Sequence, residues 1–148
     1  MVGLLDVNVL VALAWPNHIH HHAAHHWYRA HAPLGWATCP LTQSGFVRVS
    51  SNRQVIPEAA TPHESLLLLR RIVAQPHHRF WIDDTSLASS RFLAPERLQA
   101  YHQVTDAHLL ALALRHKGRL VTFDSAVGGL APKQSPAGAV CVVGGALS

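Results

Sequence analysis

Three aspartates carry the chemistry that this sequence is best placed to perform. Asp6, Asp106 and Asp124 each lie beside a strongly apolar segment, whereas the remaining acidic residues lie in polar, loop-like or helix-start contexts. A carboxylate at the edge of a hydrophobic core needs a partner, a proton or a metal ion. We therefore take these three side chains as the first candidates for a functional site.

The positions of the three acids relative to the expected elements predict that they converge. Asp6 follows a short apolar run, Asp124 ends a second one, and Asp106 lies in the first turn of an expected helix. In an open α/β sheet, ligands bind beyond the carboxyl ends of the strands and at helix N-termini. Three carboxylates brought together would repel one another, and a hard divalent cation such as Mg²⁺ removes that repulsion. Such a cation can activate a water molecule against a phosphodiester.

Each acid also has a purely local interpretation. Asp6 can cap the helix that follows it, Asp106 can complement the dipole of its own helix, and Asp124 can begin a turn with Ser125. The spacing leaves these local roles open.

Alternating short apolar runs and longer helical patterns predict a mainly parallel sheet with helices on both faces. A Thr-Pro-x-Glu capping box starts at Thr61, and Thr105 is the expected cap of a helix that ends before Gly118. The pattern shows no internal repeat or linker, which favours a single domain over residues 1–148. The expected strands are 2–5, 36–39, 80–82, 119–123 and 140–143, and the expected helices are 7–15, 20–31, 40–50, 62–75, 95–102 and 106–117.

Composition narrows the class of protein. Lys and Arg together number 12 against 8 acids, and ten of the twelve are Arg, which suits bidentate contacts to phosphate. No apolar run approaches the length of a membrane span, and the start has no signal-peptide pattern. Cys39 and Cys141 are too few for a disulfide scaffold, so we expect reduced thiols in a cytoplasmic protein.

Several segments, in order, resemble the PIN-domain family, and within it the VapC-type ribonuclease toxins of bacterial toxin–antitoxin pairs. Residues 4–10 (LLDVNVL) look like the opening strand and helix of that family, and residues 104–109 (VTDAHL) and 120–124 (LVTFD) look like its third and fourth motifs. Residues 36–48 are similar to the segment that often carries a second acid.

This resemblance implies a PIN-like three-layer α/β/α fold with a central, mainly parallel sheet of four to five strands. It implies a metal-dependent endoribonuclease, with Asp6, Asp106 and Asp124 as catalytic residues and as ligands of Mg²⁺ or Mn²⁺. It further implies an RNA substrate, a cognate VapB-type antitoxin and a homodimer, with no membrane partner. Asn8 and Thr122 match polar positions near the site and are expected to orient carboxylates or water.

One residue departs from the family pattern, because Gln43 stands where the family usually has Glu. The site would then hold three carboxylates and bind metal more weakly, or Gln43 is an ordinary polar residue at a helix start. This departure keeps a second function open, that of a weak or inactive module that binds RNA or a partner. A phosphatase of the haloacid-dehalogenase type is disfavoured, because position 8 is Asn rather than a second acid.

Three further features remain open in the sequence. The histidine-rich segment 18–31 offers i, i+4 pairs, but no third metal ligand can be assigned to it. Four consecutive leucines, 66–69, cannot all face one core on a helix, so some can pack on a second copy or an antitoxin. The arginines considered for guiding the phosphate backbone are Arg48, Arg91 and Arg97.

Overall fold

A parallel five-stranded sheet organises the protein, in a computed structural model that describes residues 1–144. The strand order is β3-β2-β1-β4-β5, and every neighbouring pair is parallel. This confirms the α/β prediction. The strands are β1 (Gly3–Leu5), β2 (Trp36–Thr38), β3 (His78–Phe80), β4 (Arg119–Thr122) and β5 (Val140–Val142).

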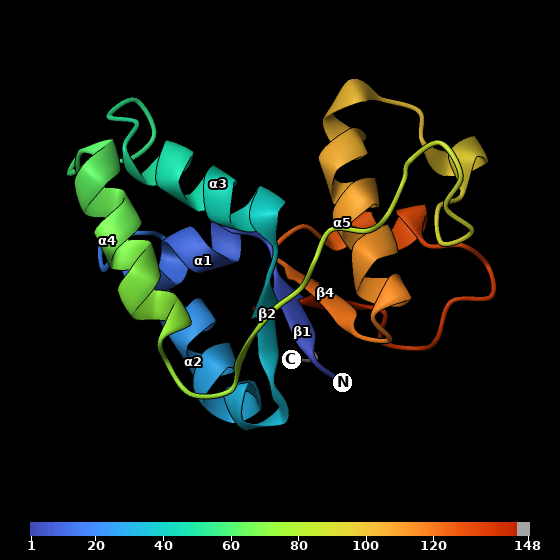
Figure 1. Cartoon of the computed structure of the whole chain (residues 1–148), viewed down its shortest axis with the longest axis horizontal. Coiled ribbons are helices and arrows are strands. Elements are labelled where there is room, and N and C mark those ends of the chain that lie inside the picture. The colour runs from blue at the N-terminus through green and yellow to red at the C-terminus, as the bar shows by residue number, and fades with distance from the viewer. Residues whose placement is uncertain (145–148) are drawn as a thin grey trace.

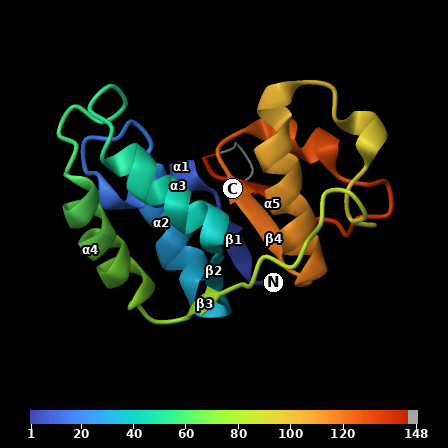
Figure 2. The same cartoon turned by 45° about the horizontal axis from the view of Figure 1, so that its top comes forward.

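Helices cover both faces of the sheet (Figures 1 and 2). The first four helices pack on one face and α5 packs on the other. Successive residues of β1 point to opposite faces, so Leu4 joins the hydrophobic cluster under α5 and Leu5 joins the cluster under the other four helices. Both leucines are fully buried, which contributes roughly 1.5–3 kcal/mol each to folding. The helices are α1 (Val7–Ala14), α2 (His21–His31), α3 (Pro40–Ser50), α4 (Pro62–Val73) and α5 (Val104–Arg115).

The capping box at the start of α4 forms as the sequence predicts. The Thr61 hydroxyl accepts a hydrogen bond from the Glu64 N–H at 3.1 Å, and the Glu64 carboxylate accepts one from the Thr61 N–H at 3.2 Å. Hydrogen bonding of the Glu64 carboxylate to the Thr61 side chain and to the Thr61 N–H lowers the pKa of Glu64. Of the four leucines that follow, Leu69 is buried, whereas Leu66 and Leu67 are 40% and 42% exposed.

The expected third strand is wrong by two residues. The strand runs over His78–Phe80 rather than 80–82: the Trp81 N–H makes the last bond to β2, to the Thr38 carbonyl at 2.8 Å, and the Trp81 side chain packs in the core beneath α5. There its ring stacks on His116, with centroids 4.6 Å apart. Trp81 of this apolar run therefore packs on α5, whereas Phe80 and Ile82 are exposed.

The region before α5 also differs from expectation. Residues 95–102 form two 3₁₀ turns, Pro95–Arg97 and Tyr101–Gln103, in place of one short helix. The helix α5 begins at Val104 and has no side-chain cap, so Thr105 is not its N-cap. At the other end Lys117 takes the left-handed conformation expected of Gly118, with φ of 59°.

The two cysteines, Cys39 and Cys141, are free thiols, as expected. Within residues 1–144, no helix is long and apolar enough to cross a bilayer.

Candidate active site

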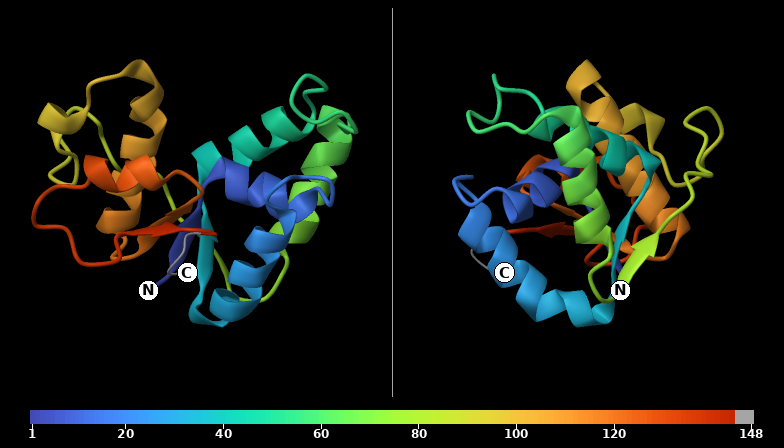
Figure 3. Two further views of the ribbon diagram at one scale, coloured as in Figure 1. Left: turned by 180° about the vertical axis from the view of Figure 1, so that it is seen from behind. Right: turned by 60° about the vertical axis from the view of Figure 1, so that its left-hand side comes forward.

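The three aspartates named from the sequence line one pocket at the carboxyl edge of the sheet. Asp6 directly follows β1, Asp124 comes two residues after β4, and Asp106 lies in the first turn of α5. Because β1 and β4 are adjacent, with Leu5 paired to Val121, their ends meet at one point. Figure 3 shows from behind how the start of α1 lies beside the end of β4. The pocket measures about 230 Å³, and its other lining residues are Asn8, Thr122 and Phe123.

Asp6 is held in place by both of its carboxylate oxygens. Oδ1 accepts a hydrogen bond from the Val7 N–H at 2.7 Å, so Asp6 is also the N-cap of α1. Oδ2 accepts one from the Thr122 hydroxyl at 3.2 Å. Burial raises the pKa of Asp6. The two hydrogen bonds lower this pKa and the charge of Asp124 raises it, each with a smaller effect than burial. Asp6 therefore has both roles that the sequence left open: it caps α1 and it lines the acidic pocket.

Thr122 links two of the three acids. Its hydroxyl donates to Asp6 and accepts a hydrogen bond from the Asp124 N–H at 3.1 Å. The side chain is 1% exposed, so little water competes for these bonds. The Asp124 carboxylate also accepts from the Ala126 N–H at 2.9 Å, which starts the 3₁₀ helix Ser125–Leu130. Thr122 thus fixes the position of Asp6 relative to the turn that carries Asp124.

Asp106 carries the strongest electrostatic signature of the site. Its pKa is raised from 3.8 to about 6, first by burial and then by the negative charges of Asp6 and Asp124, while His102 lowers it. The repulsion from Asp6 and Asp124 follows from the position of the three carboxylates around one pocket. A cation placed among them would lower that pKa by supplying the opposite charge.

The donor set suits a hydrated hard cation. Among the described residues, no three His, Cys, Asp or Glu side chains converge tightly enough to form a ready-made metal cage. Mg²⁺ commonly takes only one or two carboxylates and keeps several waters, and it completes its shell with substrate phosphates. Each Asp6 oxygen accepts one hydrogen bond and keeps a further lone pair. The pocket therefore fits Mg²⁺ better than a fully dehydrated structural metal.

Two other polar residues predicted near the site have different placements. Asn8 lines the pocket from the first turn of α1 and is exposed. Gln43 does not line it, because its amide donates to the Thr38 hydroxyl at 3.0 Å. That hydroxyl also hydrogen bonds with His78 at 2.7 Å. Gln43 therefore takes part in a polar network at the ends of β2 and β3.

The three arginines considered for phosphate contacts lie outside the pocket lining. Arg97 donates to the Ala131 carbonyl at 2.7 Å and so fastens the 3₁₀ turn Pro95–Arg97 to the loop before β5. Arg48 is exposed on α3, and the Arg91 guanidinium lies 4.9 Å from the centre of the Phe92 ring.

Two histidines of α2 cap the C-terminal end of α1. His21 hydrogen bonds with the Ala12 carbonyl at 2.7 Å, and His25 with the Leu13 carbonyl at 2.9 Å. Carbonyls at the end of a helix lack partners within the helix, and these imidazoles supply them. Of the i, i+4 pairs that the sequence offered for a metal, His21 and His25 are thus engaged in helix capping.

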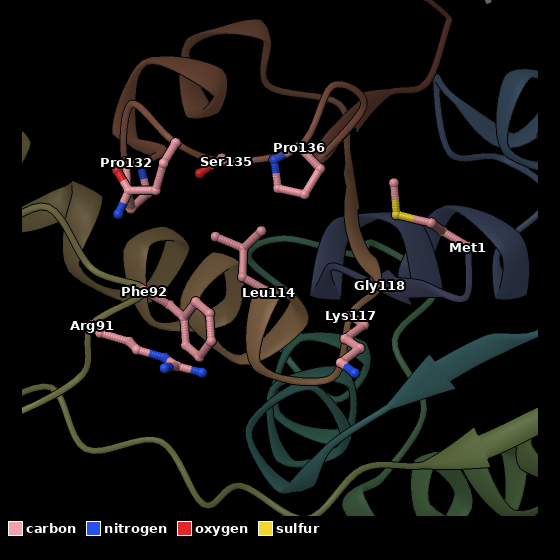
Figure 4. Close-up of a pocket in the computed structure, with 10 residues that line it drawn as sticks. Met1, Arg91, Phe92, Leu114, Lys117, Gly118, Pro132, Ser135 and Pro136 are labelled. Atoms are coloured by element: carbon pink, nitrogen blue, oxygen red, sulfur yellow. The ribbon is translucent and has the colours of Figure 1, made fainter.

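A second pocket of about 320 Å³ lies at the other end of β4, where Gly118 precedes the strand (Figure 4). Phe92 and Leu114 form its apolar floor beneath the loop that carries Ser135, and Arg91 and Lys117 stand at its edge. Among the described residues no carboxylate lines it, so it lacks the acidic groups that the first pocket brings together.

Sequence reasoning missed Phe123 as part of the site. It lies between Thr122 and Asp124 and lines the pocket, and the rings of His20 and His18 lie against it. The sequence carries a weak signal for this arrangement in the histidines that follow α1, but their distance from residue 123 along the chain hides the contact.

Comparison with known proteins agrees with this fold. The family model of the PIN domain matches residues 3–128, and the chain belongs to the PIN-domain family. It is 50% identical over 133 residues to the ribonuclease VapC38 of Mycobacterium tuberculosis, covering 90% of this chain and 92% of the relative. It is 46% identical over 127 residues to the ribonuclease VapC39 of the same organism, covering 86% and 91%.

A solved structure shares the fold at low sequence identity. The crystal structure of Mycobacterium tuberculosis VapC20, described as a toxin that cleaves the sarcin-ricin loop, aligns with a TM-score of 0.59 and 14% identity. The alignment covers 88% of this chain and 99% of that one. The two proteins therefore share the three-layer α/β/α fold.

Proposed function

We propose that this protein is a Mg²⁺-dependent endoribonuclease that acts as the toxin of a VapBC-type toxin–antitoxin pair. The observation that carries the proposal is the pocket in which Asp6, Asp106 and Asp124 meet, with the pKa of Asp106 raised to about 6. The similarity to the ribonucleases VapC38 and VapC39 supports RNA as the substrate.

Asp6, Asp106 and Asp124 are the residues that would hold Mg²⁺, or Mn²⁺ in its place. When bound, the cation would supply an activated water and neutralise charge on the phosphodiester as the bond to the leaving oxygen breaks. Thr122 keeps the Asp6 carboxylate in position through its hydrogen bond. Asn8 presents an exposed amide at the rim, suited to orienting water or a phosphate oxygen.

Cleavage of RNA in Mg²⁺ or Mn²⁺ by the wild type and two site variants tests this function. Asp6→Asn and Asp106→Asn remove one negative charge each while they keep the side-chain shape, and we expect activity to fall by 100-fold or more. Glu96→Gln is the matched control, because it removes one carboxylate from an exposed 3₁₀ turn outside the pocket. Full activity in either aspartate variant would remove it from the catalytic set.

The second function left open is a module that binds RNA or a partner without cleavage. The placement of Gln43 favours it, because this residue adds no charge to the pocket. Mg²⁺-linked thermal stabilisation separates the two functions. A working site gains about 2.7 kcal/mol at a concentration of 100 times Kd, whereas an inactive site gains none.

We also propose a cognate VapB-type antitoxin and a homodimer as protein partners. The exposed Leu66 and Leu67 of α4 support this, as does a neighbouring groove of about 350 Å³ between α1, α2 and α4 that Tyr28, Leu68 and Ile72 help to line. Substitution of Leu67 by Lys should weaken association with either partner in light scattering and co-purification. A wild type that is monomeric and binds no antitoxin would contradict the proposal.

A further inference from the structure

An aromatic stack stands on the rim of the acidic pocket. Phe123 lines the pocket next to Asp124, and the His20 ring lies over it with centroids 4.5 Å apart and planes inclined by 27°. The ring of His18 lies farther out, at 6.3 Å and 21° from Phe123. The stack joins the loop between α1 and α2 to the end of β4.

The backbone around the two histidines is fixed by hydrogen bonds. The His18 N–H donates to the Trp15 carbonyl at 3.0 Å, and the Ala24 N–H donates to the His20 carbonyl at 2.9 Å. The His20 N–H donates to Nδ1 of His18 at 3.0 Å, so that nitrogen carries no proton. Burial, followed by the charges of His20 and His21, lowers the pKa of His18.

Exposure decides which ring is available to a ligand. His20 is exposed, whereas Phe123 is partly buried against the core and already covered on one side by His20. A flat molecule at the pocket would therefore extend the stack on the outer face of His20. Histidine and phenylalanine rings are among those on which unpaired RNA bases stack.

We propose that the His20–Phe123 stack is a nucleobase subsite, which holds the base of an unpaired RNA nucleotide beside the phosphate that is cleaved. This inference rests on the proposed function, because it takes RNA as the ligand. Without a bound cation the three carboxylates repel the phosphates of the same substrate, so affinity under those conditions must come partly from groups that avoid the phosphate charge. Stacking supplies it, at about 1–3 kcal/mol per base, and tolerates any base because each has a flat face.

The test measures binding of a fluorescent single-stranded RNA oligonucleotide in EDTA and, separately, cleavage kinetics in Mg²⁺. His20→Ala should weaken binding about 5- to 100-fold and raise KM more than it lowers kcat. His20→Tyr restores a flat ring and should bind within about threefold of the wild type. His26→Ala is the matched control, because His26 is an exposed histidine of α2 outside the stack.

Oligonucleotides that lack one base at each position in turn locate the stacked nucleotide. At that position the wild type should lose as much affinity as His20→Ala loses with the intact oligonucleotide, and the variant should lose nothing more. Thermal unfolding checks that the exposed His20 is not needed for folding. Equal Kd and KM for His20→Ala and His26→Ala would overturn the subsite, and so would equal losses in His20→Ala and His20→Tyr.

The outcomes separate this inference from the proposed function. A wild type that cleaves RNA while His20→Ala matches the control refutes the subsite alone. A wild type that binds RNA through His20 but never cleaves it refutes the proposed function and leaves the subsite standing. A wild type that neither binds nor cleaves RNA overturns both.

Discussion

Replacing Asp106 by Asn should stabilise the metal-free protein and abolish the function. The pKa of Asp106 stands at about 6 in the folded state against 3.8 for the free side chain. Between these values the folded chain binds more protons than the unfolded chain, so stability is lost as the pH rises from about 4 to 6. At pH 7 the ionised carboxylate therefore opposes folding.

The magnitude follows from the same difference in pKa. A shift from 3.8 to about 6 corresponds to about 3 kcal/mol. The side chain is partly exposed and water screens its charge, which reduces the expected effect to about 1–2 kcal/mol. For a chain of 148 residues, such a gain raises Tm by roughly 2–8 °C.

The assay is thermal unfolding in EDTA from pH 4 to pH 8 for the wild type, Asp106→Asn and the control Glu96→Gln. His18 and His78 have pKa values lowered by burial, so they contribute an opposite pH dependence, which cancels in the comparison of variants. We expect the advantage of Asp106→Asn to grow between pH 4 and 7 and to reverse when Mg²⁺ is added. An Asp106→Asn protein less stable than the wild type at pH 7 in EDTA would refute the reasoning.

Three further predictions concern the supports of the site. Thr122→Val should destabilise the fold by about 1–3 kcal/mol in urea unfolding, because it removes the buried hydroxyl that accepts from the Asp124 N–H and donates to Asp6, while Thr122→Ser should retain the wild-type value. Gly45→Ala should lower stability by about 1–3 kcal/mol, since its Cβ would lie 2.6 Å from Cγ2 of Val7, whereas Gly129→Ala meets no atom within 4 Å. Tyr101→Ala should leave Tm unchanged because the side chain is 91% exposed, and a shift above about 3 °C would contradict this.

The residue pattern predicted where the acids lie, and the resemblance to the PIN-domain family added that Thr122 would orient a carboxylate or water, as it does for Asp6. Asp6 and Asp124 follow two apolar runs, and the rule that parallel strands end on one edge was enough to bring them together. The hydroxyl of Thr122 bridges them through contacts between residues 6 and 122, which no local pattern specifies. The stack of His20 on Phe123 was not predicted, because it too joins residues that are far apart in the sequence.

The errors in the fold have a common physical origin in tertiary packing. Residues 80–82 are apolar and suggest a strand, yet Trp81 is buried against α5 and Phe80 and Ile82 are exposed. A short apolar run has no periodicity that separates a strand from a packed loop. Lys117 likewise accepts a positive φ beside Gly118, because the Gly118 N–H donates to the Ala113 carbonyl at 2.8 Å and a Cβ on Gly118 would lie 2.5 Å from the Val2 carbonyl oxygen.

Substitutions of Asp6 and Asp106 are expected to change the stability of the metal-free protein in opposite directions. Hydrogen bonds hold the Asp6 carboxylate, whereas burial and repulsion disfavour the charge of Asp106. Asp6 caps α1 and receives the Thr122 hydroxyl, so Asp6→Ala leaves two donors unpaired and should lower stability by about 1–3 kcal/mol in spite of the lost repulsion. No hydrogen bond to the Asp106 carboxylate is found within residues 1–144, and its pKa is the one raised to about 6. The charge of Asp106 therefore destabilises the metal-free fold. If urea unfolding in EDTA shows both variants shifted in the same direction, the division of roles between these two aspartates is wrong.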